Sequence, residues 1–238
     1  MSLPQVLRQL TNIFLKAPCP LCHRSAIEVM CADCHRQLLA CQWPESPQGN
    51  TLSSANLGLS DNVLPVSSWG VYRGVLKQTL ALLKYGQQAD LGIWLGYQLG
   101  KYWQTGKSYY SHTQNPVVMP IPLHTKRLKQ RGYNQAALIA QGFCRVTGFS
   151  LAEHALVRTK ATNAMHSLGV HERQANLTGA FQLGTKLPSR FRPVLLIDDI
   201  YTTGTTAHAA VLPLTEAGYS ITGITTVARA VFVSPSAR

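Results

Sequence analysis

The most constraining feature of this chain is an apolar segment that ends in two neighbouring carboxylates. Val194-Leu195-Leu196-Ile197 carries no charge and is followed by Asp198-Asp199, the only adjacent pair among the ten acidic residues. An uncharged run of this length is typical of a central strand buried in a parallel sheet. Because like charges at the end of a buried strand repel each other, we expect a cation or hydroxyl donors to compensate them.

The segment after the acid pair is rich in threonine and predicts a ligand-binding loop. Glycine lets the backbone approach a ligand closely, and a helix is expected to begin at about Ala207. Amide groups at the start of a helix favour an anion, so we expect a phosphate on the loop and a polyol or metal beside the acid pair. The loop residues are Thr202, Thr203, Gly204, Thr205 and Thr206.

The strand, the acid pair and Thr-Thr-Gly-Thr-Thr together resemble the signature of the type I phosphoribosyltransferases. The resemblance implies that Asp198 and Asp199 are the catalytic pair and contact the ribose hydroxyls of phosphoribosyl pyrophosphate (PRPP). It also implies that Thr202 to Thr206 hold the 5′-phosphate of PRPP. The chain contains neither a Walker loop nor a dinucleotide fingerprint. The alternative without a ligand is a strand and turn that happen to be acidic.

The charge balance favours polyanionic partners. The 238 residues include 22 Lys and Arg but only 10 Asp and Glu, which gives a net charge of +12. Such a field suits phosphorylated small molecules or nucleic acid, and a solvated basic surface is the alternative. The start of the chain lacks the features of a secretory signal, and no run approaches the roughly 18 apolar residues of a membrane span. We therefore expect a cytoplasmic protein.

Four cysteines near the N-terminus form two Cys-x-x-Cys motifs that predict a structural zinc site. Two such knuckles complete a tetrahedral set of thiolates and leave no open position for chemistry. Disulfides and a redox Cys-x-x-Cys are the alternatives, and His23, His35 and Cys41 are nearby substitute ligands. The predicted zinc ligands are Cys19, Cys22, Cys31 and Cys34.

Composition divides the chain into three parts. Residues 1–45 hold an N-terminal helix and the zinc module, and residues 46–65 form a linker rich in Pro, Ser and Asn. Strands, Gly or Pro loops and helices then alternate from about Val66 to Val227. This alternation predicts a parallel α/β sheet flanked by helices in a domain of residues 66–238, with ligands at the carboxyl ends of the strands.

A second basic segment follows a short apolar strand at residues 116–119. Four cations fall within the six residues 126–131, in a predicted loop that precedes a helix from about Gln135 to Cys144. A cluster of this density suits a pyrophosphate or a nucleic-acid backbone, and a solvated turn is the alternative. The cations are Lys126, Arg127, Lys129 and Arg131.

This segment resembles the most characteristic motif of the ComF/GntX family of phosphoribosyltransferase-like proteins. The motif is Pro-x-Pro-Leu-His at residues 120–124, followed by Arg127 and by Arg131-Gly-Tyr-Asn-Gln. An earlier match is Tyr-x-Gly-x-x-Lys at residues 72–77, followed by Lys84-Tyr85-Gly86 in a predicted helix. The resemblance implies that Arg127 and Arg131 contact pyrophosphate and that Lys84 lies near the active cleft. From the residues alone, Lys84 could equally lie on a solvated helix face.

A segment from Leu156 to Phe181 resembles the mobile active-site flap of this family. Arg, Thr, Leu, Arg, Asn and the closing Gly-Ala-Phe have the family spacing, although Met165 stands where the family usually has Gln. A polar lid would exclude water from a ribosyl cation-like transition state. A helix-bearing surface excursion is the alternative.

Two functions follow from the resemblance. As an enzyme, the protein would displace pyrophosphate from Mg²⁺-bound PRPP and transfer the phosphoribosyl group to an acceptor that the sequence does not identify. As a non-catalytic factor, it would be similar to the competence proteins that assist DNA uptake and transformation, and would bind single-stranded DNA or DNA-processing proteins. Fold alone does not choose between the two.

Overall fold

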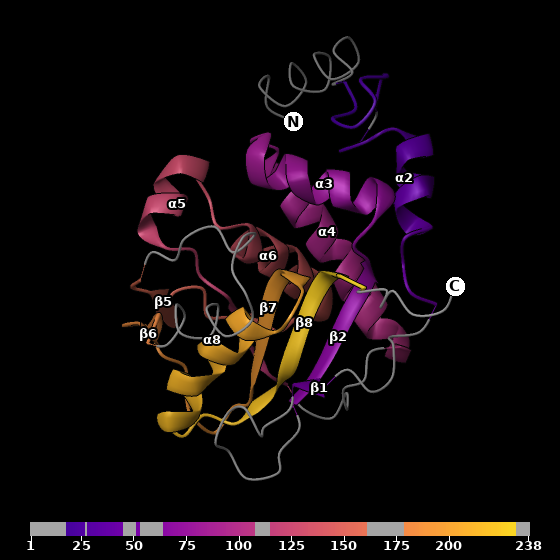
Figure 1. Ribbon diagram of the computed structural model, residues 1–238. Coiled ribbons are helices and arrows are strands. Elements are labelled where there is room, and N and C mark those ends of the chain that lie inside the picture. Colours follow the sequence, from indigo (N-terminus) through magenta and orange to yellow (C-terminus); the bar gives the residue numbers. More distant parts are fainter. Residues whose placement is uncertain are drawn as a thin grey trace, which may run out of the picture.

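A six-stranded sheet forms the centre of the structure, which is a computed structural model that describes residues 18–26, 28–44, 51–52, 64–107, 115–160 and 179–231 (Figure 1). Five neighbouring strands run parallel, and only the short edge strand β1 is antiparallel to its neighbour. In spatial order the strands are β1 (Thr51–Leu52), β2 (Leu64–Val71), β8 (Ile221–Arg229), β7 (Val194–Tyr201), β3 (Val117–Pro120) and β4 (Ser150–Leu151). The predicted parallel α/β sheet is therefore confirmed.

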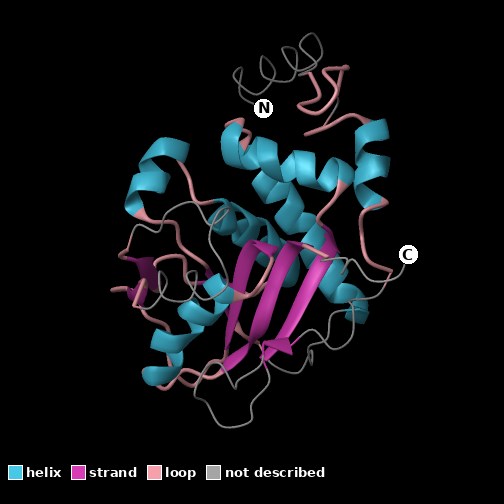
Figure 2. Ribbon diagram, in the orientation of Figure 1, coloured by secondary structure: helices cyan, strands magenta, loops and turns pink. Residues whose placement is uncertain are grey.

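Helices cover both faces of this sheet (Figure 2). One face carries α3 (Gly74–Tyr85), α4 (Ala89–Tyr102) and α6 (Gln135–Thr147), whereas α8 (Thr205–Glu216) lies on the other. A π-helical turn, η2 (Trp103–Lys107), extends α4. Two short strands, β5 (Leu156–Arg158) and β6 (Phe181–Leu183), form a separate antiparallel pair. Among the described residues, no helix has both the length and the apolar character needed to cross a membrane.

Strand β7 is buried on both faces, as its apolar sequence predicts. Leu195 and Ile197 belong to the core on the α3, α4 and α6 side, whereas Val194 and Leu196 belong to the core beneath α8. Successive side chains of a strand point to opposite faces, so each apolar residue of β7 serves one of the two cores. The strand continues through the acid pair to Tyr201.

Helices α4 and α6 approach closely because each has a glycine at the crossing. A Cβ built on Gly96 would lie 2.0 Å from the Ile139 carbonyl oxygen, and one on Gly142 would lie 2.0 Å from the Ile93 carbonyl oxygen. Neither position can hold a side chain without moving the helices apart. This contact fixes the helix layer behind the central strands.

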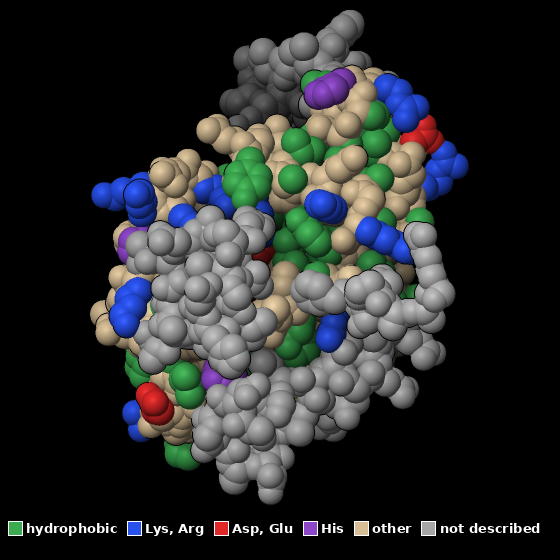
Figure 3. Space-filling view, in the orientation of Figure 1, with side chains coloured by type: hydrophobic (Ala, Val, Ile, Leu, Met, Phe, Trp, Pro, Cys, Tyr) green, Lys and Arg blue, Asp and Glu red, His purple; other side chains and the backbone are tan. Residues whose placement is uncertain are grey.

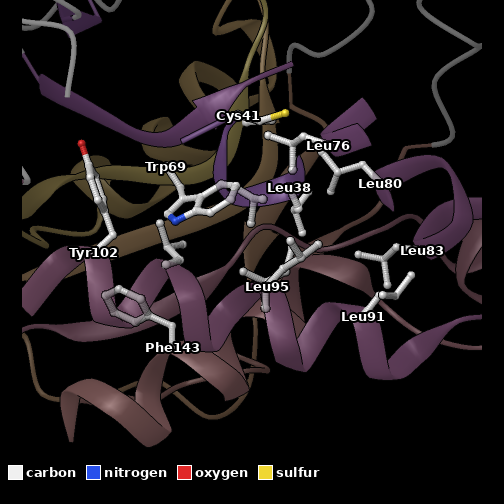
Figure 4. Close-up of a cluster of buried hydrophobic side chains, with 14 of the residues drawn as sticks. Leu38, Cys41, Trp69, Leu76, Leu80, Leu83, Leu91, Leu95, Tyr102 and Phe143 are labelled. Carbon is white, nitrogen blue, oxygen red and sulfur yellow. The ribbon is translucent and has the colours of Figure 1, made fainter. Parts of the chain in front are cut away.

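The described part of the N-terminal module shares its core with the main sheet. Helix α2 (Ala32–Leu39) places Leu38 beside Trp69 of β2 and the leucines of α3 and α4 (Figure 4). The Trp43 amide donates to the Trp69 carbonyl at 2.9 Å, and the Val71 amide donates to the Cys41 carbonyl at 2.9 Å. The chain after α2 therefore runs along the end of β2, which itself begins at Leu64.

The basic segment after β3 is helical, and the prediction of a loop there is wrong. Residues Thr125–Arg131 form α5, because Nδ1 of His124 accepts the Lys126 amide at 3.2 Å and caps the first turn. The helix ends at Gly132, whose φ of 83° is left-handed. Pro213 lies inside α8, which is one continuous helix. Residues 161–178 of the predicted flap, including Met165, lie outside the described residues.

Candidate functional site

The carboxyl ends of the parallel strands bring the acid pair and Lys84 together. Asp198 and Asp199 lie near the end of β7, and Lys84 lies in the last turn of α3, which covers one face of the sheet. Nζ of Lys84 lies 2.5 Å from Oδ2 of Asp199, and Asp199 is buried. The cation expected for the acid pair is therefore Lys84, and the solvated-face alternative for Lys84 is wrong.

The ion pair holds both of its members in the charged form. Burial works against the charge of Lys84, but the Asp199 carboxylate outweighs it and raises the pKa of the lysine. Burial likewise acts to raise the pKa of Asp199, but Lys84, with smaller contributions from Asp198 and Arg131, lowers it. Asp199 is thus an ionised and oriented carboxylate.

Asp198 lies in a different environment. Its Oδ1 accepts the Asp199 backbone amide at 2.8 Å, and the residue lines a small hollow of about 20 Å³ that is open to solvent. Burial and the neighbouring Asp199 charge raise the pKa of Asp198 well above its usual range. The other residues that line the hollow are Ile200, Tyr201, Thr202, Gly204, Thr206, Ala207, Ile224 and Thr226. Asp198 is therefore the member of the pair that a ligand in this hollow meets first.

The threonine loop closes one end of this hollow. Gly204 has a φ of 78°, a left-handed conformation that turns the chain from β7 into α8. The helix begins at Thr205, and the hydroxyl oxygens of Thr203 and Thr205 lie 2.8 Å apart. The first amides of a helix lack acceptors within the helix, so this loop can bind an anion through amides and hydroxyls together.

The two predicted pyrophosphate arginines lie on the other side of the acid pair. Arg131 stacks its guanidinium 5.7 Å from the ring of Tyr85, hydrogen-bonds to Gln135, and contributes to the lowered pKa of Asp199. Arg127 is partly buried in the same helix. Figure 3 shows Lys and Arg side chains at several separate places on this side of the molecule. The acid pair is thus bordered by cations from α3 and α5.

Arg158 is a further charged residue of the site that the sequence prediction did not include. Arg158 is buried and is the last residue of β5. Its backbone forms an isolated parallel β-bridge with that of His124, which precedes α5. Burial and the charge of Arg127 lower its pKa, while Asp198 acts in the opposite direction. Arg158 therefore faces both the basic helix and the acid pair. Its signal in the sequence is an arginine at the inward position of Leu-Val-Arg, where an apolar residue is expected.

The four predicted zinc ligands converge in the N-terminal module. Their sulfur atoms all lie within 4.8 Å of one another, and those of Cys22 and Cys31 are 3.5 Å apart. Zinc–sulfur bonds of about 2.3 Å in a tetrahedron require sulfur atoms about 3.8 Å apart, so the four residues fit zinc. All described cysteines are free thiols, which contradicts the disulfide alternative. Of the substitute ligands, the Cys41 thiol donates a hydrogen bond to the Gln37 carbonyl, and the His35 ring packs against the Trp94 ring.

Arg24 supports one ligand of this cluster directly. Its Nε donates to the Cys22 sulfur at 3.4 Å, and its Nη1 pairs with Asp33 at 2.8 Å. The hydrogen bond from Arg24 lowers the pKa of Cys22 to about 6. Because the thiolate is the form that binds metal, this contact favours metal binding at neutral pH.

The chain is similar in sequence to several competence and DNA-utilization proteins. It is 26% identical to the competence protein ComFC of Bacillus subtilis over 209 residues, which cover 84% of this chain and 72% of that protein. It is 36% identical over 93 residues to competence protein F of Haemophilus influenzae and over 89 residues to DNA utilization protein YhgH of Escherichia coli K12. The chain is therefore similar to proteins of the ComF kind. The last two matches span only 41% and 38% of the relatives' own lengths.

Other comparisons add less to this similarity. No family model matches the chain. A hypoxanthine phosphoribosyltransferase from Staphylococcus aureus aligns with 58% of this chain and 61% of its own, at 17% identity and a TM-score of 0.33. The description of the fold of this ComF-like protein therefore rests on its own strand order and helix layers.

Proposed function

We propose that this ComF-like protein binds PRPP and transfers its phosphoribosyl group to an acceptor. The observation that carries the proposal is the arrangement around the end of β7. The hollow of Asp198 opens onto the loop at the start of α8, and Lys84 and Arg131 act on the neighbouring Asp199. A ligand with a phosphate at one end, hydroxyls in the middle and a second polyanion at the other end matches this order.

In the proposed complex, each group of the ligand has a partner. Amides and hydroxyls of Thr202 to Thr206 bind the 5′-phosphate. Asp198 accepts hydrogen bonds from the ribose hydroxyls, and Lys84 keeps Asp199 ionised and fixed beside it. Arg127 and Arg131 bind the pyrophosphate, and Arg158 adds a third cation between them and Asp198.

The transfer breaks one bond and forms another at C1 of the ribose. The C1–oxygen bond breaks, and its electron pair leaves with the pyrophosphate. A lone pair of the acceptor nucleophile forms the new bond to C1, and the proton of the nucleophile is released. Mg²⁺ bound with PRPP would offset the negative charge of the leaving group. The arginines of α5 and Arg158 stabilise that charge as it develops.

The two halves of PRPP provide a test that maps the site. We expect ribose 5-phosphate and pyrophosphate each to bind alone, as measured by titration calorimetry, and each to compete with PRPP. Thr203→Ala should weaken ribose 5-phosphate binding only, and Arg131→Gln should weaken pyrophosphate binding only. If neither variant affects either half-ligand, the proposed orientation is wrong.

We propose that this protein acts in the cytoplasm and contains structural zinc. The described cysteines are free and four of them fit zinc, which suits a reducing compartment. We propose that residues 1–45 form the zinc module, residues 46–65 a linker and residues 66–238 the PRPP-binding domain. The role of zinc is structural because four thiolates leave no open position.

A second candidate function is the binding of single-stranded DNA without catalysis. The net charge of +12 and the competence and DNA-utilization names of the relatives favour it. Arg131 and the 76% exposed Tyr85 also offer a cation beside an aromatic ring, a combination that suits stacked bases. DNA-processing proteins would then be its partners.

Salt dependence separates this function from the first. Binding of a single-stranded oligonucleotide should weaken steeply between 50 and 200 mM salt if several phosphates are contacted. Absence of measurable oligonucleotide binding at low salt would leave only the small-ligand function.

A further inference from the structure

An arginine at the end of β8 has no anionic partner in the described part of the protein. The Arg229 guanidinium stacks over the Tyr201 ring at 5.0 Å from the ring centroid. Within the described residues, its Nη1 is buried and has no hydrogen-bond partner. Burial lowers the pKa of Arg229, as expected for a cation that is partly removed from water. A buried guanidinium nitrogen is costly unless something pairs with it.

The Tyr201 ring connects Arg229 to the candidate site. Tyr201 carries Arg229 on one side of its ring and also lines the hollow that contains Asp198. Residue 229 pairs with Val71 in β2 and with Tyr201 in β7, so it lies between the ends of three parallel strands. Arg229 is thus held at the same edge of the sheet as the acid pair.

Two further cations belong to the start of α3, whose first residues follow a backbone contact with Arg229. The Tyr72 amide donates to the Arg229 carbonyl at 2.8 Å, and Arg73 follows directly as the N-cap of α3. Nζ of Lys77 lies 6.0 Å from the centroid of the Tyr72 ring. Arg73 and Lys77 are exposed. We call Arg73, Lys77 and Arg229 the β8 corner.

The β8 corner is separate from the predicted pyrophosphate arginines. In the sheet, β8 and β2 lie on one side of β7, whereas β3, which leads into α5, lies on the other. The proposed binding of PRPP uses the cations of α5 for pyrophosphate and the threonine loop for the 5′-phosphate. Neither end of PRPP therefore needs the β8 corner.

We propose that the β8 corner binds an anionic group of the acceptor, with Arg229 as the central contact. The acceptor is then a compound that bears a carboxylate or a phosphate in addition to its nucleophile. This inference rests on the proposed transfer from PRPP and names the substrate class of that reaction. The anion would pair with a guanidinium that is already desolvated and oriented by Tyr201, so little reorganisation accompanies binding.

The probes for the test are benzoate and its neutral isostere benzamide, titrated into protein already saturated with PRPP and Mg²⁺. We expect benzoate to bind about ten-fold more tightly than benzamide, a difference of about 1.4 kcal/mol. The preference should vanish in Arg229→Gln and shrink in Lys77→Gln, which lies on the exposed side of the corner. Arg145→Gln, on the exposed side of α6, is the matched control and should keep the preference.

Three results would overturn the inference. Equal binding of the two probes by the unaltered protein would do so, as would a preference that persists undiminished in Arg229→Gln. Displacement of benzoate by a single-stranded oligonucleotide in a strongly salt-dependent way would assign the corner to a nucleic-acid backbone instead.

The PRPP titration that precedes each experiment separates the two proposals. PRPP binding without a benzoate preference refutes only the anionic acceptor, whereas a lack of PRPP binding refutes the proposed function and this inference with it.

Discussion

Lys84 of α3 and Asp199 of β7 are joined by a buried ion pair, with Nζ 2.5 Å from Oδ2. The pair lies beside Asp198, whose pKa is raised by burial and by the charge of Asp199. One carboxylate is therefore fixed by the protein, and the other is left for a ligand. This division of roles gives the two aspartates opposite effects on stability.

Replacing Lys84 by Met should destabilise the protein strongly. The change leaves Asp199 buried without its partner, which costs about 3 kcal/mol in comparable pairs. Lys77→Met, at an exposed position of the same helix, should change the free energy of unfolding by less than about 0.5 kcal/mol. Urea unfolding measures both. Equal stability of the two variants would show that the ion pair has no structural role.

Replacing Asp198 by Asn should stabilise the ligand-free protein at neutral pH, by about 1 kcal/mol. A carboxyl whose pKa is raised on folding favours folding most below its unfolded pKa of about 3.9, and this contribution is lost as pH rises towards the folded pKa. The free energy of unfolding of Asp198→Asn should therefore exceed that of the unaltered protein by a margin that grows from pH 4 upwards.

Asp199→Asn should behave in the opposite way. The lowered pKa of Asp199 contributes stability that is present above the unfolded pKa and is lost as pH falls through the folded pKa. This variant should be less stable than the unaltered protein at pH 7, and the difference should shrink in acid. Thermal unfolding from pH 3 to pH 8 measures both variants. Parallel curves for the two would contradict the assignment of distinct roles.

The cysteine cluster should hold one zinc ion per chain. Cys19→Ser combined with Cys22→Ser removes half of the ligand set, so the metal should be lost and the α2 region should become open to proteolysis. Cys144→Ser, a thiol far from the cluster in sequence, should retain the metal. Metal analysis of the purified proteins measures this. Full zinc content in the double variant would show that other residues bind the ion.

Gly204→Ala and Gly148→Ala form a matched pair. Both glycines have left-handed backbones, Gly204 just before the first residue of α8 and Gly148 just after the last residue of α6, with φ of 78° and 74°, so each substitution should cost about 1 kcal/mol of stability. Only Gly204 lies in the threonine loop. We therefore expect Gly204→Ala to weaken ribose 5-phosphate binding and Gly148→Ala to leave it unchanged. An equal effect of the two would place the phosphate elsewhere.

Much of this architecture is predictable because apolar patterns and turn residues determine it locally. The uncharged run at Val194–Ile197 predicts a strand buried on both sides, and Gly86 marks the end of α3 as expected. The cluster of four cysteines is predictable because the spacing of the two Cys-x-x-Cys motifs suits tetrahedral coordination of one metal ion. The basic segment 126–131 escapes prediction as a helix because its cap is a histidine, which is not among the usual capping residues.

The parts of the site that the sequence leaves open depend on contacts between distant segments. Lys84 and Asp199 are 115 positions apart, so only the packing of α3 on the sheet shows that they pair. The role of Arg158 also depends on contacts between distant segments, because it follows from the position of β5 beside α5 and β7. The sequence does not distinguish the two aspartates. Their pKa values shift in opposite directions because Lys84 pairs directly with Asp199, whereas burial and the Asp199 charge dominate at Asp198.

Titration calorimetry of PRPP with Mg²⁺ tests the central claim most directly. The unaltered protein should bind PRPP, Asp198→Asn should lose at least about ten-fold in affinity, equivalent to about 1.4 kcal/mol, and Asp90→Asn, an exposed residue of α4, should bind normally. Because Asp198→Asn is expected to be the more stable protein, lost binding cannot be attributed to unfolding. Equal affinity in all three proteins, or no binding by the unaltered protein, would contradict the account.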